Sequence, residues 1–125
     1  MKAPTSKVYA FAIVAMGAAL HAFEQLAKSS DPSVGWFLWA MMPYAICVPI
    51  VLLGKSGVPG AVGVSITFAL DLITHNDVFL NPKGSTAALG LIFVPLWSSL
   101  VFAPVAMLVA WLVIRRRAQV ENHAA

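Results

Sequence analysis

Long apolar stretches separated by short polar links dominate the pattern along the chain. The apolar stretches cover about residues 8–27, 34–53, 58–77 and 87–114. A helix rises about 1.5 Å per residue, so about 20 apolar residues cross the hydrocarbon core of a bilayer. Each stretch is long enough for one crossing, and the fourth is longer than one crossing needs. The pattern therefore predicts an all-α integral membrane protein with four spans.

The links between these stretches are short, at residues 29–33, 54–57 and 81–84. Short links favour antiparallel neighbours, which predicts a four-helix up-down-up-down bundle. We expect residues 1–125 to form a single transmembrane domain, with residues 115–125 as a short disordered tail. The basic start of the chain resembles a secretion signal, but Leu20-His21-Ala22 is a poor cleavage site. We therefore expect the first span to be retained.

Composition agrees with a membrane protein. The chain is 60% hydrophobic and only 10% charged, whereas about 25% of the residues of a soluble domain are charged. A soluble fold of this size could not bury so much apolar surface, so lipid is the expected partner. The net charge of +3 does not indicate nucleic-acid binding, because the basic residues flank the apolar stretches.

The basic residues also predict the orientation in the membrane. With four crossings, both termini share a side with the second link. Six basic residues fall on that side and two on the other: Lys2, Lys7, Lys55, Arg115, Arg116 and Arg117, against Lys28 and Lys83. Loops rich in Lys and Arg stay in the cytoplasm. We expect a multi-pass protein of the plasma (inner) membrane with cytoplasmic N- and C-termini.

Two pairs of titratable residues lie near the ends of otherwise apolar spans. His21 and Glu24 are three residues apart in the first span, and Asp71 and His75 are four apart in the third. Each spacing places both side chains on one face of a helix. Such residues are costly inside a membrane, so they mark the default functional site. The topology places both pairs at the extracytoplasmic side and at similar depth.

Small residues predict which helices meet there. In the third span, small and polar residues recur every three or four positions, at Gly60, Gly63, Thr67, Asp71 and Thr74. The first span has a matching face through Gly17 and His21. Small residues allow membrane helices to approach closely. We therefore expect a contact between the first and third helices that brings His21 towards Asp71, with Glu24 and His75 nearer the surface.

Several chemistries fit these four residues. Imidazole and carboxylate groups suit a divalent transition metal bound by His21, Glu24, Asp71 and His75. Chains of acids and imidazoles also relay protons, and Gln25, Thr67, Thr74 and Asp77 would extend such a polar network. Haem held between His21 and His75 is a third hypothesis. The fourth is a purely structural His–Asp pair that locks two helices together.

No nucleophile elbow, phosphate loop, dinucleotide fingerprint or zinc-protease motif is present in the sequence. We therefore expect a non-enzymatic accessory subunit or small carrier whose outward-facing polar site binds metal or protons. The alternative is a metal- or haem-binding redox enzyme subunit. Length and helix count are similar to those of small multidrug transporters, but that family carries a lone Glu within its first span, and Glu24 lies near the outer end. Four helices leave little room for a pathway, so we expect a homodimer or a larger membrane complex.

Overall fold

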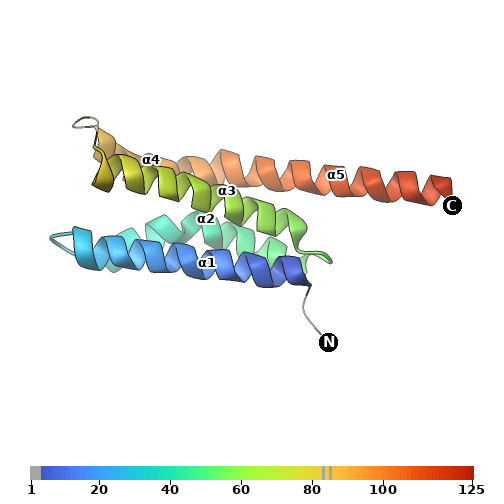
Figure 1. Ribbon diagram of the computed structural model, residues 1–125, viewed down its shortest axis with the longest axis horizontal. Coiled ribbons are helices and arrows are strands. Elements are labelled where there is room, and N and C mark those ends of the chain that lie inside the picture. Colours follow the sequence, from blue (N-terminus) through green and yellow to red (C-terminus); the bar gives the residue numbers. More distant parts are fainter. Residues whose placement is uncertain (1–3, 83, 85) are drawn as a thin grey trace.

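The computed structural model describes residues 4–82, 84 and 86–125, and every element in this part of the chain is a helix (Figure 1). The first half contains α1 (Thr5–Phe23), the π-helical turn η1 (Glu24–Lys28), and α2 (Val34–Leu53). The second half contains α3 (Val58–His75), η2 (Asn76–Leu80), η3 (Ala87–Leu89), α4 (Gly90–Trp97), η4 (Ser98–Phe102) and α5 (Ala103–Ala124).

Joined end to end, these elements form four helices that are long and apolar enough to cross a membrane. They cover Thr5–Lys28, Val34–Leu53, Val58–Leu80 and Ala87–Ala124. The predicted all-helical character and the four apolar helices are confirmed, and the second helix has the predicted bounds. The first and third helices are longer than the predicted spans, because α1 already begins at Thr5 and the π-helical turn η2 continues the third helix to Leu80.

The predicted disordered tail is wrong, because α5 continues as a helix through Ala124. Arginine, alanine, glutamine and glutamate in residues 115–121 have high helix propensity. The Arg115 guanidinium lies 5.2 Å from the centre of the Trp111 ring, a cation–π contact within the helix. In the last turn, the ring nitrogen Nδ1 of His123 lies 2.7 Å from the carbonyl oxygen of Gln119.

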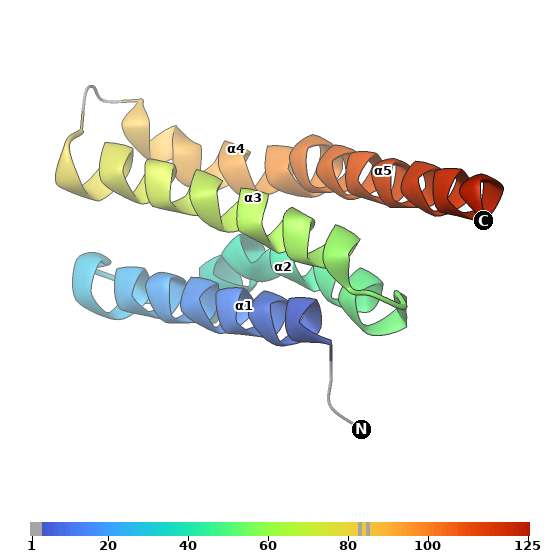
Figure 2. The same cartoon turned by 45° about the vertical axis from the view of Figure 1, so that its right-hand side comes forward.

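Helix α3 is the central element of the packing. It packs against α1, α2, α4 and α5, and α2 also packs against α1 and α4. Within the described part of the chain, the main packing partners of α1 are α2 and α3, and not α4 or α5. Figures 1 and 2 show the same separation from two directions, with α3 lying between α1 and the rod formed by α4 and α5.

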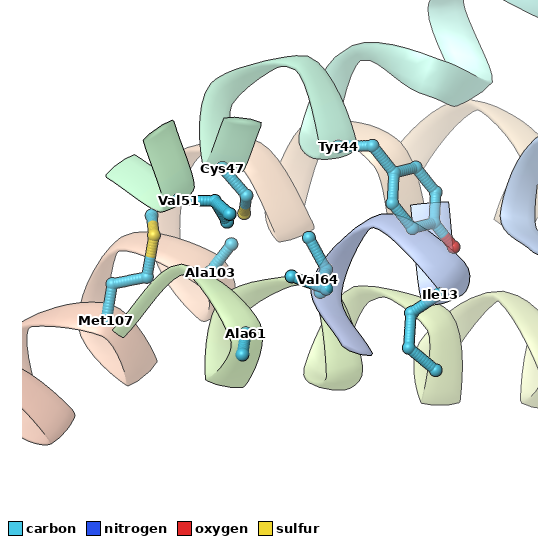
Figure 3. Close-up of a cluster of buried hydrophobic side chains, with 9 residues drawn as sticks. Ile13, Tyr44, Cys47, Val51, Ala61, Val64, Ala103 and Met107 are labelled. Atoms are coloured by element: carbon cyan, nitrogen blue, oxygen red, sulfur yellow. The ribbon is translucent and has the colours of Figure 1, made fainter. Parts of the chain in front are cut away.

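The apolar core is shared by four helices (Figure 3). It consists of Ala10, Ile13, Tyr44, Cys47, Val51, Ala61, Val64, Ala103 and Met107. Close approach is possible because small residues of α3 face this core. The Cα of Gly60 faces Val51 of α2, and that of Gly63 faces Cys47 and Met107. Helices α2, α3 and α5 therefore meet over glycine. The spacing predicted a closely packed face on α3, but its small residues were used to predict the contact with the first helix and not with α2 and α5.

The links between successive helices lie at alternating ends of the molecule (Figure 1). The start of α1 and the end of α5 lie towards one end of the molecule, which we call the terminal end; we call the opposite end, where the first helix ends and α2 begins, the distal end. The start of α1 is fixed to the end of α2, because the Lys7 ammonium donates to the Leu52 carbonyl at 3.0 Å and the Ser6 hydroxyl donates to the Ser56 carbonyl. Helix α5 extends beyond the other helices at the terminal end.

Candidate functional site

The four titratable residues predicted to form a site gather near the distal end. His21 lies in the last turn of α1, and Glu24 is the first residue of η1. Asp71 and His75 lie on the last turns of α3, four residues apart. Because α1 and α3 pack against each other, the two pairs face each other across this interface.

These residues form a continuous chain of hydrogen bonds. The Nε2 atom of His21 lies 3.0 Å from Oδ2 of Asp71. Its other ring nitrogen, Nδ1, lies 2.9 Å from Oε2 of Glu24. The second oxygen of Glu24, Oε1, lies 2.8 Å from Nδ1 of His75. The predicted contact of His21 with Asp71 is therefore confirmed, and one histidine bridges two carboxylates.

Burial along the chain differs in part from the prediction. Glu24 was expected nearer the surface, but it is only 6% exposed, the same as His21, and Asp71 is 4% exposed. The reason is that η1 continues the helix past Glu24 and keeps its carboxylate turned towards α3. The side chain of His75 is 13% exposed against 7% for His21. The chain of hydrogen bonds therefore runs from an enclosed end at Asp71 towards a more open end at His75.

Tyr44 is the residue that sequence reasoning missed. It lies in the middle of α2, is fully buried, and donates its hydroxyl to Oδ2 of Asp71 at 2.6 Å. Its ring lies over Gly17 of α1, where a Cβ atom would come within 2.5 Å of the tyrosine Cζ. The signal was present in the sequence, because a tyrosine deep in an apolar span needs a partner for its hydroxyl. We name the set Tyr44–Asp71–His21–Glu24–His75 the relay.

The hydrogen bonds of the relay require one more hydrogen than two neutral imidazoles supply. Each link between a ring nitrogen and a carboxylate oxygen needs a hydrogen, because two lone pairs repel each other. The three such links therefore need three hydrogens, and two neutral imidazoles supply two. With both carboxylates ionised, the third hydrogen makes His21 an imidazolium that donates to both neighbours. The two acids and two histidines then carry a combined charge of −1.

A cavity of about 490 Å³ lies beside the relay. His21, Glu24 and Asp71 line it with their acid and imidazole groups. Apolar residues of η3 and α4 line another part, together with Trp36 and Ala40 of α2 and Phe79 of η2. The other polar residues of the lining are Gln25, Lys28, Ser29, Ser30 and Thr74. The cavity lies among α1, α2, α3 and α4, all of which contribute to its lining. The buried acids and imidazole are therefore accessible to a ligand and not sealed inside a core.

None of the four residues predicted to extend the polar network has a hydrogen bond to the relay among the described residues. Gln25 accepts a hydrogen bond from the Ser33 backbone at 3.0 Å, and Thr74 donates to the Leu70 carbonyl at 2.8 Å. Asp77 accepts from the neighbouring Asn76 side chain at 3.4 Å. Thr67 is fully buried and has no hydrogen-bond partner among the described residues. Gln25 and Thr74 still line the cavity, so their part in binding stays a prediction.

The geometry of the relay bears on the metal and haem hypotheses. Within residues 4–82, 84 and 86–125, no group of three or more His, Cys, Asp or Glu side chains is arranged to hold a metal ion. Both ring nitrogens of His21 are directed at carboxylate oxygens, whereas a metal or haem iron needs a ring nitrogen lone pair directed at it. In this arrangement neither ring nitrogen of His21 is free to bind a metal or haem iron.

Comparison with protein-family models, with curated proteins and with solved structures finds no match to this chain.

Proposed function

We propose that this protein is a small, non-enzymatic carrier of the plasma membrane that takes up protons through the relay at its distal end. The observation that carries the proposal is the hydrogen-bonded sequence Tyr44–Asp71–His21–Glu24–His75, which needs one proton beyond the complement of its neutral imidazoles. Acids and imidazoles in such chains serve as proton relays in membrane transport proteins.

The exterior of the molecule supports membrane insertion. Large apolar side chains are exposed on all four long helices, among them Phe11, Leu38, Ile73, Phe93 and Leu108. A soluble monomer rarely exposes so much contiguous apolar surface. We propose that the helices form a single membrane domain as an up-down-up-down bundle. The excess of basic residues at the terminal end then places both termini in the cytoplasm and the relay at the outer side.

Two buried hydroxyls support a path that continues inwards from the relay. Thr67 lies one helical turn from Asp71 on the same face of α3, and Ser98 lies in η4, which packs against α3. Neither hydroxyl has a partner among the described residues. Buried polar groups are normally satisfied, often by water. We propose that water bound at these hydroxyls links the relay to the inner half of the protein.

The proton-carrier proposal predicts a loss of proton flux in Asp71→Asn. The amide keeps the shape of the side chain but cannot bind the relay proton as a carboxylate does, so uptake should slow about tenfold or more. Flux is measured in proteoliposomes that contain a trapped pH dye, with the voltage clamped by potassium and valinomycin. Asp31→Asn is the matched control, because Asp31 is exposed in the link after η1 and should leave flux unchanged. Equal flux in wild type, Asp71→Asn and empty liposomes would disprove the carrier.

If protons follow this inward path, Thr67→Val should lower proton flux without lowering the stability of the protein. The valine side chain fills nearly the same volume without a buried, unpartnered hydroxyl, so stability should be unchanged or slightly higher. Proton flux should fall, because the path loses a polar group. Ser65→Ala is the control, since the Ser65 hydroxyl only donates to Ala61 of its own helix at 2.7 Å. Undiminished flux in Thr67→Val would show that protons do not pass this residue.

A further inference from the structure

We propose that the cavity beside the relay binds a lipophilic amine, a protonated nitrogen on an apolar body. The inference rests on the proposed carrier function, whose cargo it names. It is carried by three features of the cavity: an unused carboxylate oxygen, the net negative charge of the relay and a largely apolar lining elsewhere.

The unused oxygen belongs to Asp71. Its Oδ2 atom accepts from both His21 and Tyr44. Its Oδ1 atom has no hydrogen bond within the described residues, although the side chain is only 4% exposed and lines the cavity. It is also absent from the atoms that are fully enclosed without a partner, which are Thr67 Oγ1 and Ser98 Oγ. Oδ1 is therefore an acceptor open to the cavity, and it suits a donor carried by a ligand.

Charge selects the kind of donor. The acids and histidines of the relay carry a combined charge of −1 once every link has its hydrogen, so a cationic donor is favoured over a neutral or anionic one. The cavity also has a basic residue of the protein in its lining, Lys28. Its ammonium is at the exposed rim, 6.0 Å from the centre of the Phe23 ring, and water can solvate it there. An ammonium group on the ligand fits the inner part of the cavity, next to Asp71.

The remaining lining selects the body of the ligand. Leu89, Leu91, Ile92, Val94 and Pro95 line another part of the cavity, and Trp36 and Phe79 add aromatic surface. Ligand sites commonly combine such apolar walls with a few polar groups that fix orientation. An apolar chain or ring would lie along α4 while its nitrogen donates to Oδ1 of Asp71.

The test compares three small probes that share one body: phenylbutylamine, phenylbutanol and phenylbutyrate. Binding to the full-length protein in nanodiscs is followed by tryptophan fluorescence, and Trp36→Phe shows how much of the signal comes from the cavity. We expect saturable binding of the amine, at least about tenfold tighter than of the alcohol or the acid. Asp71→Asn should weaken amine binding about tenfold, and Asp31→Asn should leave it unchanged. Ala40→Phe, which fills the cavity from α2, should abolish binding.

Equal affinity for the three probes, no binding of any probe, or wild-type amine affinity in Asp71→Asn would each overturn the proposal. If Asp71→Asn fails to fold, the comparison of the three probes on wild type still decides. The test is also separate from the carrier assay. Loss of proton flux in Asp71→Asn without amine binding would refute only the cargo class, whereas amine binding without any flux would refute the carrier.

Discussion

Replacing His21 with leucine is expected to lower the free energy of unfolding by about 3–5 kcal/mol, because a buried ion pair that loses one partner leaves uncompensated charge. His21 separates the carboxylates of Glu24 and Asp71 and donates to both. Without it, two buried acids face a leucine with no hydrogen between them. The loss should exceed by several-fold the average of about 0.6 kcal/mol for one interhelical hydrogen bond in a membrane protein.

The unfolding free energy can be measured through Cys47, the only cysteine of the chain and a fully buried one. Its thiol should react with a maleimide only after unfolding, so labelling during a titration with SDS reports the unfolded fraction. His123→Leu is the matched control, because His123 is exposed near the end of α5. Adding Asp71→Asn to His21→Leu should restore part of the stability by removing one unpaired charge. A His21→Leu protein as stable as His123→Leu would show that the relay does not carry the expected charges.

Gly60→Ala is expected to destabilise the protein by about 1–3 kcal/mol through overpacking. A Cβ atom on Gly60 would lie 2.8 Å from the backbone nitrogen and 3.0 Å from the Cα of Val51, and it would also meet the Val51 side chain. A backbone cannot rotate out of the way, so α2 and α3 must move apart along the core. This separation of the helices should also weaken the Tyr44–Asp71 hydrogen bond, because Tyr44 lies on α2 and Asp71 on α3.

Gly35→Ala is the matched control for this prediction. Gly35 lies in the first turn of α2, is exposed, and would place its Cβ 3.5 Å from the Ser33 hydroxyl at the closest. There the same substitution should be neutral or should stabilise the helix by up to about 1 kcal/mol, since alanine has the higher helix propensity. Both variants are compared by Cys47 labelling in SDS. A similar change in stability in the two would contradict close packing at Gly60.

The sequence contained enough information to predict the four apolar helices and the central contact of the site. Residues three or four apart share a helical face, so glycines and polar residues at this spacing identified the face of α3 that packs closely. The same rule applied to α1 placed His21 opposite Asp71, which the 3.0 Å distance confirms. The spacing could not show that His21 uses both ring nitrogens, because this depends on side-chain rotamers within the finished interface.

Other features depend on how whole helices pack. Tyr44 does not stand out in the hydrophobic pattern of α2. Only the register of α2 against α3 brings its hydroxyl to Asp71. The cavity exists because α4 packs on α2 and α3 and not on α1, and hydrophobic periodicity does not specify which pairs of helices pack. The helical end of α5 was missed for a different reason: its polar residues were read as a solvated tail, although their helix propensity is high.

The projecting end of α5 also makes this small protein easier to image. The helix runs without interruption from Ala103 to Ala124 and extends beyond the other helices at the terminal end. A soluble helical domain fused in register after Ala124 would inherit a fixed orientation from this rod. Such a fiducial would stand on the side opposite the relay, so particles could be aligned in electron micrographs while ligands still reach the distal end.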